Sequence, residues 1–238
     1  METRLDRYMV DAGLVKTRSQ ASMLIKQGDV SCNGKVITKT SFLVDENVKI
    51  EISSGELYVS RGAHKLVGAI NEFGLDFKGK VIADCGASTG GFTQVSLKHG
   101  ASKVYAIDVG HNQLSPLFTS DDRVVNLEGV NLKNDYTLPE KVDFCVADLS
   151  FISIRLVFKT MASLLKENGK AVVLIKPQFE AGKARLGKGG IVKKEYQQEI
   201  LDEVLTWFQE ENYIIEKQID SPIKGKTGNK EYLILVSV

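Results

Sequence analysis

Two short apolar runs each carry an aspartate at or near their end, and a turn of small residues follows the first run. Asp84 lies in VIADC, residues 81–85, and the turn GASTGGF, residues 86–92, comes directly after it. Asp108 ends the run KVYAID, residues 103–108. Such runs predict strands of a parallel sheet, whose carboxyl ends form the edge where ligands bind. The two acids are therefore candidate ligand-binding residues.

The chemistry of this turn argues against a dinucleotide. A dinucleotide-binding turn needs the spacing G-x-G-x-x-G, and the middle glycine is absent here. A carboxylate at Asp84 would repel a pyrophosphate but can neutralise an ammonium group, directly or through water, and Asp108 can accept hydrogen bonds from a ribose diol. A purely structural turn is the alternative, and it leaves the two acids unexplained. The pattern predicts S-adenosylmethionine as the cofactor, bound by Asp84, Gly86, Ala87, Ser88, Thr89, Gly90, Gly91, Phe92 and Asp108.

Four further charged residues lie at the ends of predicted elements. Lys65 comes early in a helix predicted over residues 63–73, and Glu231 begins the last predicted strand. Asp148 and Lys176 end the runs DFCVAD and AVVLIK. Each one alone is compatible with an ordinary surface charge, but four of them at predicted ligand-side positions indicate a reaction site.

Other chemistries fit less well. The stretch ADLSF, residues 147–151, lacks the pair of prolines typical of amino-group methyltransferases. Cys145 falls inside a predicted strand and Cys85 beside the turn, where small buried residues are expected rather than nucleophiles. With Cys32 they make three cysteines without any CxxC spacing, so neither disulfides nor a metal site is expected.

The elements that must position these residues alternate as strand and helix. Strands are predicted at 81–85, 103–108, 123–127, 143–148 and 171–176, and helices at 63–73, 90–99, 152–165 and 195–209. The last two strands, 213–220 and 231–238, have too short a connection for a crossover helix and should pair antiparallel. This pattern predicts an α/β, Rossmann-like seven-stranded methyltransferase fold.

A smaller α+β pattern precedes this fold. A short helix with Thr3 as its cap, a second helix opened by Thr17 and Gln20 as a capping box, and a hairpin with the turn Asn33-Gly34 are predicted in turn. The last strand falls within residues 48–52. The basic residues of this segment would lie on or near one side of it, as a surface for phosphates.

The net charge of +1 conceals two basic segments. Residues 14–40 carry five basic side chains against one acid, and residues 176–194 carry six against one. Two such segments indicate an anionic partner such as nucleic acid, although each alone is also compatible with a solvated face. No run approaches the roughly 20 apolar residues of a membrane span, and no signal peptide is visible, so a cytoplasmic protein without a membrane partner is expected.

The segment from RLDRYMV to NGKVI resembles the S-four-like RNA-binding domain of a ribosomal protein, pseudouridine synthases and tyrosyl-tRNA synthetases. The resemblance covers roughly residues 4–52. It implies a domain at 1–52, a linker at 53–58 and a catalytic domain at 59–238. The residues expected to contact RNA are Arg4, Lys16, Arg18, Lys26, Lys35, Arg61, Lys183, Arg185 and Lys188.

The motifs YVSRGAHKL, DCGASTGGF, AIDVG, ADLSF, LIKPQFE and GNKEYL resemble the TlyA-type, haemolysin A-like branch of the FtsJ-like RNA ribose 2′-O-methyltransferases. This resemblance implies a catalytic tetrad at Lys65, Asp148, Lys176 and Glu231, with Ala63 as a small departure from the usual glycine. It also implies cytidine in ribosomal RNA as the substrate, within ribosomal subunits. A non-catalytic RNA-binding assembly factor and a membrane-lytic haemolysin are the alternatives, and neither explains the cofactor acids and the tetrad together.

Overall fold

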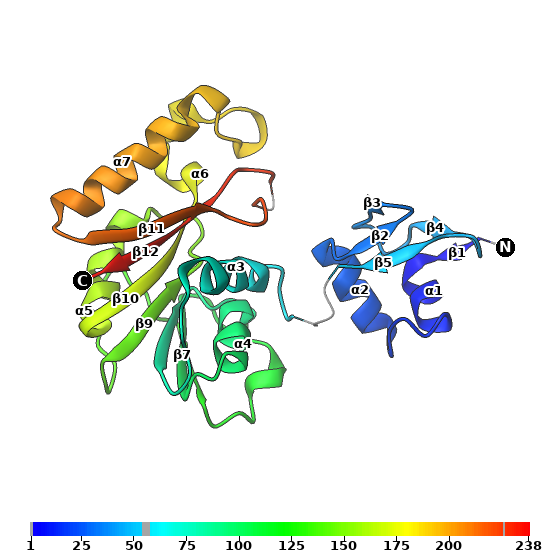
Figure 1. Ribbon diagram of the computed structural model, residues 1–238, viewed down its shortest axis with the longest axis horizontal. Coiled ribbons are helices and arrows are strands. Elements are labelled where there is room, and N and C mark those ends of the chain that lie inside the picture. Colours follow the sequence, from blue (N-terminus) through cyan, green and yellow to red (C-terminus); the bar gives the residue numbers. More distant parts are fainter. Residues whose placement is uncertain (1, 54–57, 226) are drawn as a thin grey trace. The chain divides into compact units, whose positions relative to one another are not determined.

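The computed structural model describes residues 2–53, 58–225 and 227–238, and the chain divides into two compact units, 1–61 and 62–238 (Figure 1). Most of the linker predicted at 53–58 lies outside the described residues. The domain boundaries at 52 and 59 stay a prediction.

The N-terminal unit combines two helices with short strands. Its elements are β1 (Thr3–Arg4), α1 (Leu5–Asp11), α2 (Arg18–Gln27), β2 (Val30–Cys32), β3 (Lys35–Val36), β4 (Leu43–Val44) and β5 (Ile50–Ile52). Strand β2 lies between β3 and β5, and β1 pairs with β4. The apolar faces of both helices meet the strands in one small core that includes Leu5, Met9, Leu24, Ile25 and Val30.

Helix α2 begins as the sequence predicts. The Thr17 side chain accepts a hydrogen bond from the Gln20 backbone N–H at 3.2 Å, and the Gln20 side chain accepts one from the Lys16 N–H at 3.0 Å. Gly28 ends the helix with a φ of +82°. Thr17 therefore satisfies one of the free N–H groups at the start of the helix.

The start of α1 differs from the prediction, and the cap expected at Thr3 is wrong. Thr3 pairs with Val44 in the β1–β4 ladder, so its backbone is already extended and hydrogen-bonded. Arg4 occupies the N-cap position and makes no side-chain cap. A two-residue strand leaves no periodic pattern in the sequence, which is why the cap was assigned one residue too early.

The C-terminal unit is built on a seven-stranded sheet in the order β11-β12-β10-β9-β6-β7-β8. Strand β12 runs antiparallel to both neighbours, and every other neighbouring pair in this sheet is parallel. This topology confirms the predicted fold. The strands are β6 (Val81–Cys85), β7 (Lys103–Asp108), β8 (Val124–Glu128), β9 (Val142–Ala147), β10 (Leu165–Ile175), β11 (Ile214–Asp220) and β12 (Tyr232–Ser237).

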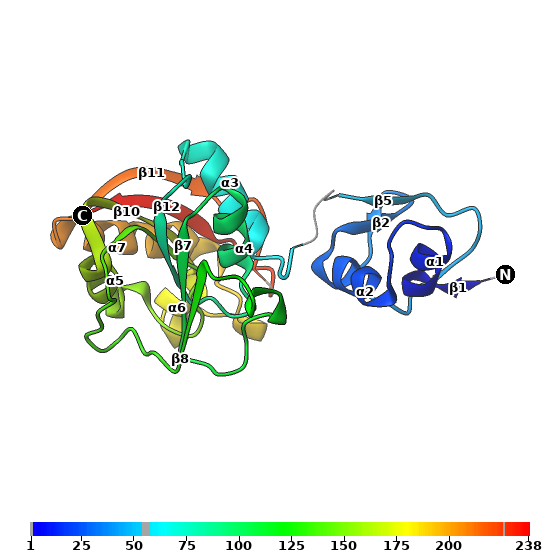
Figure 2. The same cartoon turned by 90° about the horizontal axis from the view of Figure 1, so that it is seen from below.

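Helices cover both faces of this sheet. Helices α5 (Phe158–Leu164) and α7 (Gln197–Glu210) pack on one face, and α3 (Ala63–Phe73) and α4 (Gly91–Lys98) lie on the other (Figures 1 and 2). Sheet residues that face α5 and α7 form a buried core with Phe158, Met161 and Phe208. The remaining helical segments are α6 (Pro177–Glu180), η1 (Pro116–Phe118), η2 (Ile154–Leu156), η3 (Lys183–Arg185), η4 (Lys188–Gly190) and η5 (Lys194–Tyr196).

The helix predicted over residues 152–165 is divided in two. The Ser153 side chain accepts a hydrogen bond from the Arg155 N–H and opens the tight turn η2. Val157 has a φ of −125°, which is not helical, and α5 begins only after it. Leu165 belongs to β10, where it pairs with Val142. Side-chain capping at Ser153 therefore competes with the helical pattern that the apolar residues suggest.

Candidate active site at the carboxyl edge of the sheet

The turn after β6 requires glycine at two positions. Gly86 has a φ of +86°, and a Cβ atom there would lie 3.0 Å from the Leu149 side chain and 3.3 Å from the Asp148 carbonyl oxygen. Gly90 has a φ of +91°, and a Cβ atom there would collide with the Phe118 ring and lie 2.9 Å from Leu114. Any larger side chain at either position would be strained and crowded. The backbone therefore passes close to its neighbours between β6 and α4.

Asp84 is completely buried beneath this turn. Its Oδ2 atom accepts a 2.6 Å hydrogen bond from the Thr93 hydroxyl on α4, and its Oδ1 atom has no hydrogen-bond partner among the described residues. Burial raises the pKa of Asp84 to about 7; hydrogen bonds from Thr93 oppose the rise, and the charges of Asp148 and Asp108 add to it. A buried, half-satisfied carboxyl group of this kind is prepared to receive a charged donor.

Asp108, at the end of β7, stabilises the same turn by hydrogen bonds. Its Oδ2 atom accepts a 2.8 Å hydrogen bond from the Ser88 N–H, and its Oδ1 atom accepts one of 2.8 Å from the Gly110 N–H. Ser88 has a φ of +48°, so this residue is held in a backbone conformation that side chains disfavour. The sequence indicated a ligand-binding acid at Asp108 but not its structural role. Its half-buried carboxylate keeps further lone pairs for a ligand.

The four candidate tetrad residues lie together and form a chain of ion pairs. Lys65 Nζ lies 2.8 Å from Glu231 Oε2 and 3.3 Å from Asp148 Oδ2, and Lys176 Nζ lies 2.6 Å from Asp148 Oδ1. The distance between Lys176 and Asp148 is that of an ion pair, but the two groups are not aligned for a hydrogen bond. Helix α3, the ends of β9 and β10, and the residue before β12 supply one member each. Segments up to 166 residues apart thus converge.

The ion pairs hold buried charges. Lys65, Lys176 and Glu231 are 6%, 8% and 3% exposed, so none of them is an ordinary surface charge. Burial alone would raise the pKa of Asp148, but the nearby positive charges of Lys176 and Lys65 outweigh it, and the pKa is lowered. Asp148 is therefore ionised and holds both lysines by charge.

Three residues in this region were not singled out from the sequence. The Ser150 hydroxyl accepts a 2.7 Å hydrogen bond from Lys176 Nζ, and Gln178 Nε2 donates to Glu231 Oε1 at 3.3 Å. The Glu180 carboxylate accepts hydrogen bonds from the Ser153 hydroxyl at 2.6 Å and the Ile154 N–H at 2.8 Å. Ser150 stands in the motif ADLSF and the other two in KPQFE, so the motifs contained the only signal.

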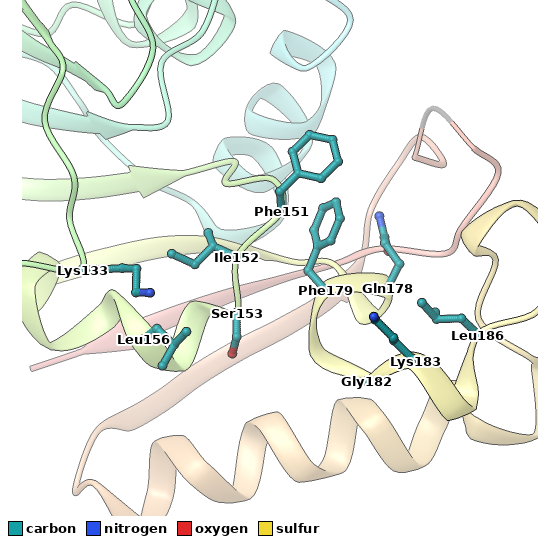
Figure 3. A pocket seen from close by; sticks show the side chains of 10 residues that line it. All are labelled: Lys133, Phe151, Ile152, Ser153, Leu156, Gln178, Phe179, Gly182, Lys183 and Leu186. Carbon is teal, nitrogen blue, oxygen red and sulfur yellow. The ribbon is translucent and has the colours of Figure 1, made fainter.

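A pocket lies where the segment after β9 faces α6 and η3 (Figure 3). Phe151 is 91% exposed, has a φ of +64°, and lies 5.2 Å from Phe179 between ring centroids. Lys176 Nζ lies 5.9 Å from the Phe179 ring centroid. The pocket has a volume of about 470 Å³ and is lined by Lys133, Phe151, Ile152, Ser153, Leu156, Gln178, Phe179, Gly182, Lys183 and Leu186.

The residues expected to contact RNA have different surroundings. Lys183 lines the pocket, whereas Arg185 is held by Glu203 on α7 at 2.7 Å. Arg4 and Arg18 both contact Asp6. Arg61 is half-buried in the N-terminal unit. Lys16, Lys26, Lys35 and Lys188 are exposed, as are Arg4, Arg18 and Lys183.

In the part of the chain that the structure describes, no group of three or more His, Cys, Asp or Glu side chains could hold a metal ion. Among the same residues, no helix has both the length and the apolar character needed to cross a bilayer. The three cysteines, which the sequence predicts to be small buried residues, are buried and unbridged.

Comparison with known proteins assigns both units. Residues 58–237 match the FtsJ-like methyltransferase family, and residues 3–50 match the S4 domain. The chain is 41% identical to Hemolysin A of Brachyspira hyodysenteriae, over 97% of this chain and 98% of that protein. It is 39% identical to the 16S/23S rRNA (cytidine-2′-O)-methyltransferase TlyA of Mycobacterium tuberculosis, over 97% of this chain and 88% of the relative.

A solved structure of a candidate hemolysin from Streptococcus thermophilus agrees with both assignments. It shares 35% identity and a TM-score of 0.76, and the match covers 99% of this chain and 88% of the other. The family match spans the whole C-terminal sheet, the turn after β6 and the four ion-paired residues. The chain therefore belongs to the FtsJ-like methyltransferase family, as a TlyA/hemolysin A-type member with an N-terminal S4 domain.

Proposed function

We propose that this chain transfers a methyl group from S-adenosylmethionine to the ribose 2′-hydroxyl of cytidine in ribosomal RNA. The observation that carries the proposal is the buried series of ion pairs that joins Glu231, Lys65, Asp148 and Lys176. These residues lie beside the turn at residues 86–92, which we propose to bind the cofactor. The TlyA relative, named for this activity and aligned over nearly the whole chain, supports the choice of substrate.

The residues around the turn fit this cofactor. Asp84 Oδ1, buried without a partner among the described residues, would receive the cofactor ammonium group directly or through water, and Asp108 would bind its ribose. Glycine at positions 86 and 90 lets the turn pack closely against Leu149 and Phe118, which fixes the backbone around the proposed site. When bound, the cofactor supplies a methyl group on a positively charged sulfur. The other turn residues, Ala87, Ser88, Thr89, Gly91 and Phe92, would complete this site.

Lys176 is the residue best placed to act on the substrate hydroxyl. A ribose hydroxyl is a weak nucleophile, and its attack improves when its proton moves toward a base and its oxygen is held in line. The Lys176 amine is fixed between the Asp148 carboxylate and the Ser150 hydroxyl, at the carboxyl end of β10. Only the neutral amine can accept a proton, so Lys176 would act as base in that form and as a positioning group when protonated.

Lys65 and Glu231 would support this arrangement from the other side of Asp148. Lys65 contacts Asp148 Oδ2 while Lys176 contacts Oδ1, so the carboxylate cannot turn without breaking one ion pair. Glu231 balances Lys65, and Gln178 holds the second Glu231 oxygen. The tetrad thus keeps the Lys176 amine in one place without a net excess of buried charge.

The test of the function is methyl transfer to purified ribosomal subunits. The full-length chain is incubated with S-adenosylmethionine and small or large bacterial subunits, and the RNA is digested to nucleosides for mass spectrometry. We expect new 2′-O-methylcytidine with the wild-type chain and much less, formed about 10²-fold more slowly, with a Lys176→Ala variant. A chain that binds the cofactor and the subunits but produces no methylated nucleoside would support a non-catalytic assembly factor instead, and a base-methylated product would rule out the ribose as acceptor.

A further inference from the structure

A buried acid in the N-terminal unit lies between two exposed arginines. Asp6, in the first turn of α1, is 2% exposed. Arg4 donates from Nε to Oδ1 and from Nη2 to Oδ2, each at 3.0 Å, and Arg18 donates from Nη2 to Oδ2 at 3.1 Å. The side chains of Arg4 and Arg18 are 48% and 62% exposed. One carboxylate therefore holds two solvent-facing guanidinium groups.

The geometry brings the two guanidinium groups close together. Both Nη2 atoms contact the same Oδ2 atom, so they lie at most about 6 Å apart, which is within reach of the oxygens of one phosphate group. A guanidinium has five N–H donors. Arg4 uses two of them on Asp6 and Arg18 uses one, which leaves donors on both for a ligand. Without the acid, two positive charges this close would repel each other.

The Asp6 carboxylate also keeps its negative charge and its position. Hydrogen bonds from Arg4 lower its pKa to about 2; burial opposes this effect, and Arg18 contributes to the lowering. The carboxylate is therefore ionised at any pH at which RNA is handled. An ion pair between exposed side chains contributes little to stability, because its partners keep their freedom. Here the acid is buried and fixed, so it restricts the orientation of both arginines.

We propose that Asp6 is a positioning residue that holds Arg4 and Arg18 as one two-arginine site for a backbone phosphate of the RNA. The proposal rests on the proposed function for its RNA ligand and goes beyond it by naming the group bound and the acid that prepares the site. Arginine suits this task because its planar fork binds phosphate oxygens in pairs. The site reads no base, so it contributes affinity and register rather than sequence preference.

Whether Asp6→Asn strengthens or weakens RNA binding tests the proposal. Asp6→Asn removes a negative charge from an RNA-binding surface, which by electrostatics alone should tighten binding. If Asp6 positions the arginines, the same change weakens binding, because one acceptor oxygen becomes an amide donor that Arg4 and Arg18 cannot use. Asp11→Asn is the matched control, since Asp11 lies on the same helix, has a side chain that is 63% exposed and forms an ion pair with Arg7 at 3.6 Å.

Filter binding of the full-length chain to ribosomal RNA extracted from bacterial ribosomes, at several salt concentrations, gives the readout. We expect Asp6→Asn to weaken binding by about fivefold or more and to make the salt dependence shallower by about one to two units. The Asp11→Asn control should bind as tightly as wild type or slightly more tightly. Equal or tighter binding by Asp6→Asn overturns the proposal and leaves the RNA function intact.

A second variant covers loss of folding. Arg4→Lys combined with Arg18→Lys keeps both charges and the acid but replaces each fork with a single amine. If Asp6→Asn does not fold, as judged by thermal unfolding, this double variant decides: weaker binding supports the two-arginine site, and unchanged binding overturns it. Absence of RNA binding by the wild-type chain would overturn both this proposal and the proposed function.

Discussion

Charge balance decides what the residues of the candidate site can do. Lys65, Lys176, Asp148 and Glu231 are two cations and two anions in alternation, so each buried charge has an opposite neighbour. Removing one member leaves its neighbour buried without full compensation, which is costly in a low dielectric. Substitutions here therefore need a separate check of folding before a loss of rate is assigned to chemistry.

Lys176 gives the sharpest prediction at this scale. Lys176→Ala should lower the single-turnover methylation rate by about 10²-fold or more, the scale of a lost general base, while cofactor affinity stays near normal. Lys176→Arg should not restore the rate, because a guanidinium is never neutral and places its donors differently. Lys159→Ala, at an exposed lysine on α5, is the control. A near-normal rate in Lys176→Ala would exclude Lys176 from catalysis.

Asp84 predicts how cofactor binding depends on pH. Its pKa of about 7 means that the carboxyl group becomes increasingly protonated as the pH falls below 7, and the protonated form cannot form an ion pair with an ammonium group. Affinity for S-adenosylmethionine should therefore rise as the pH increases from 6 to about 7.5, and fall above about 8, where an α-amino group loses its proton. Calorimetry at half-unit intervals measures this profile.

An Asp84→Asn variant is the control for the pH profile. It should bind more weakly at pH 7.5 and lose the rise on the acid side, because its side chain does not titrate. A wild-type affinity that is constant between pH 6 and 7.5 would contradict the pairing of Asp84 with the ammonium group.

Sequence reasoning found the residues of the site that stand in local motifs. Asp84 and Asp108 were visible because each follows a strong apolar run, and the tetrad was visible through family resemblance. The partners of Glu180 were not visible, because Ser153 lies 27 residues away and only the tertiary fold brings them together. Glutamine and serine also carry no charge pattern, so Gln178 and Ser150 gave no signal of their own.

At the scale of elements, strand prediction succeeded where burial is complete. The runs VIADC and KVYAID match β6 and β7 to the residue because central parallel strands are apolar throughout. Prediction failed for β1 and β4, which are two residues long, and at the start of β10, which includes a register shift between Leu165 and Lys170. Short or irregular strands have no period to detect.

The segment between β9 and η2 depends on Glu180 for its position. This segment carries Ser150 and Phe151, and Glu180, almost fully buried in its side chain, accepts hydrogen bonds from both Ser153 and Ile154. Glu180→Ala should lower the free energy of unfolding by about 1–3 kcal/mol, because the Ile154 N–H loses its partner. Chemical denaturation measures this loss, and the methylation rate should fall as well.

Glu195→Ala, at an exposed glutamate in η5, is the control for the Glu180→Ala change. It removes the same charge from the surface and should alter the unfolding free energy by less than about 0.5 kcal/mol. A Glu180→Ala chain as stable and as active as wild type would show that the segment is held by its other contacts.

At the scale of the whole molecule, we propose that RNA binding and methyl transfer belong mainly to different units. The C-terminal unit contains the turn after β6 and the four ion-paired residues, and each unit has a buried core of its own. The predicted RNA contacts Arg4, Lys16, Arg18, Lys26 and Lys35 all belong to the N-terminal unit. Cofactor binding and RNA binding should therefore separate when the chain is shortened.

Deletion of residues 1–52 tests this division. The shortened chain should keep its affinity for S-adenosylmethionine, because every residue proposed to hold the cofactor lies at or beyond Asp84, but its affinity for ribosomal RNA should fall sharply. The salt dependence of the remaining binding should be shallower by about three to four units if four or five basic residues contact phosphates. Calorimetry with the cofactor shows that the shortened chain is folded, and filter binding at several salt concentrations gives the slope. Equal RNA affinity and an equal slope for both chains would place the main RNA contacts on the C-terminal unit, around Lys183 and Lys188.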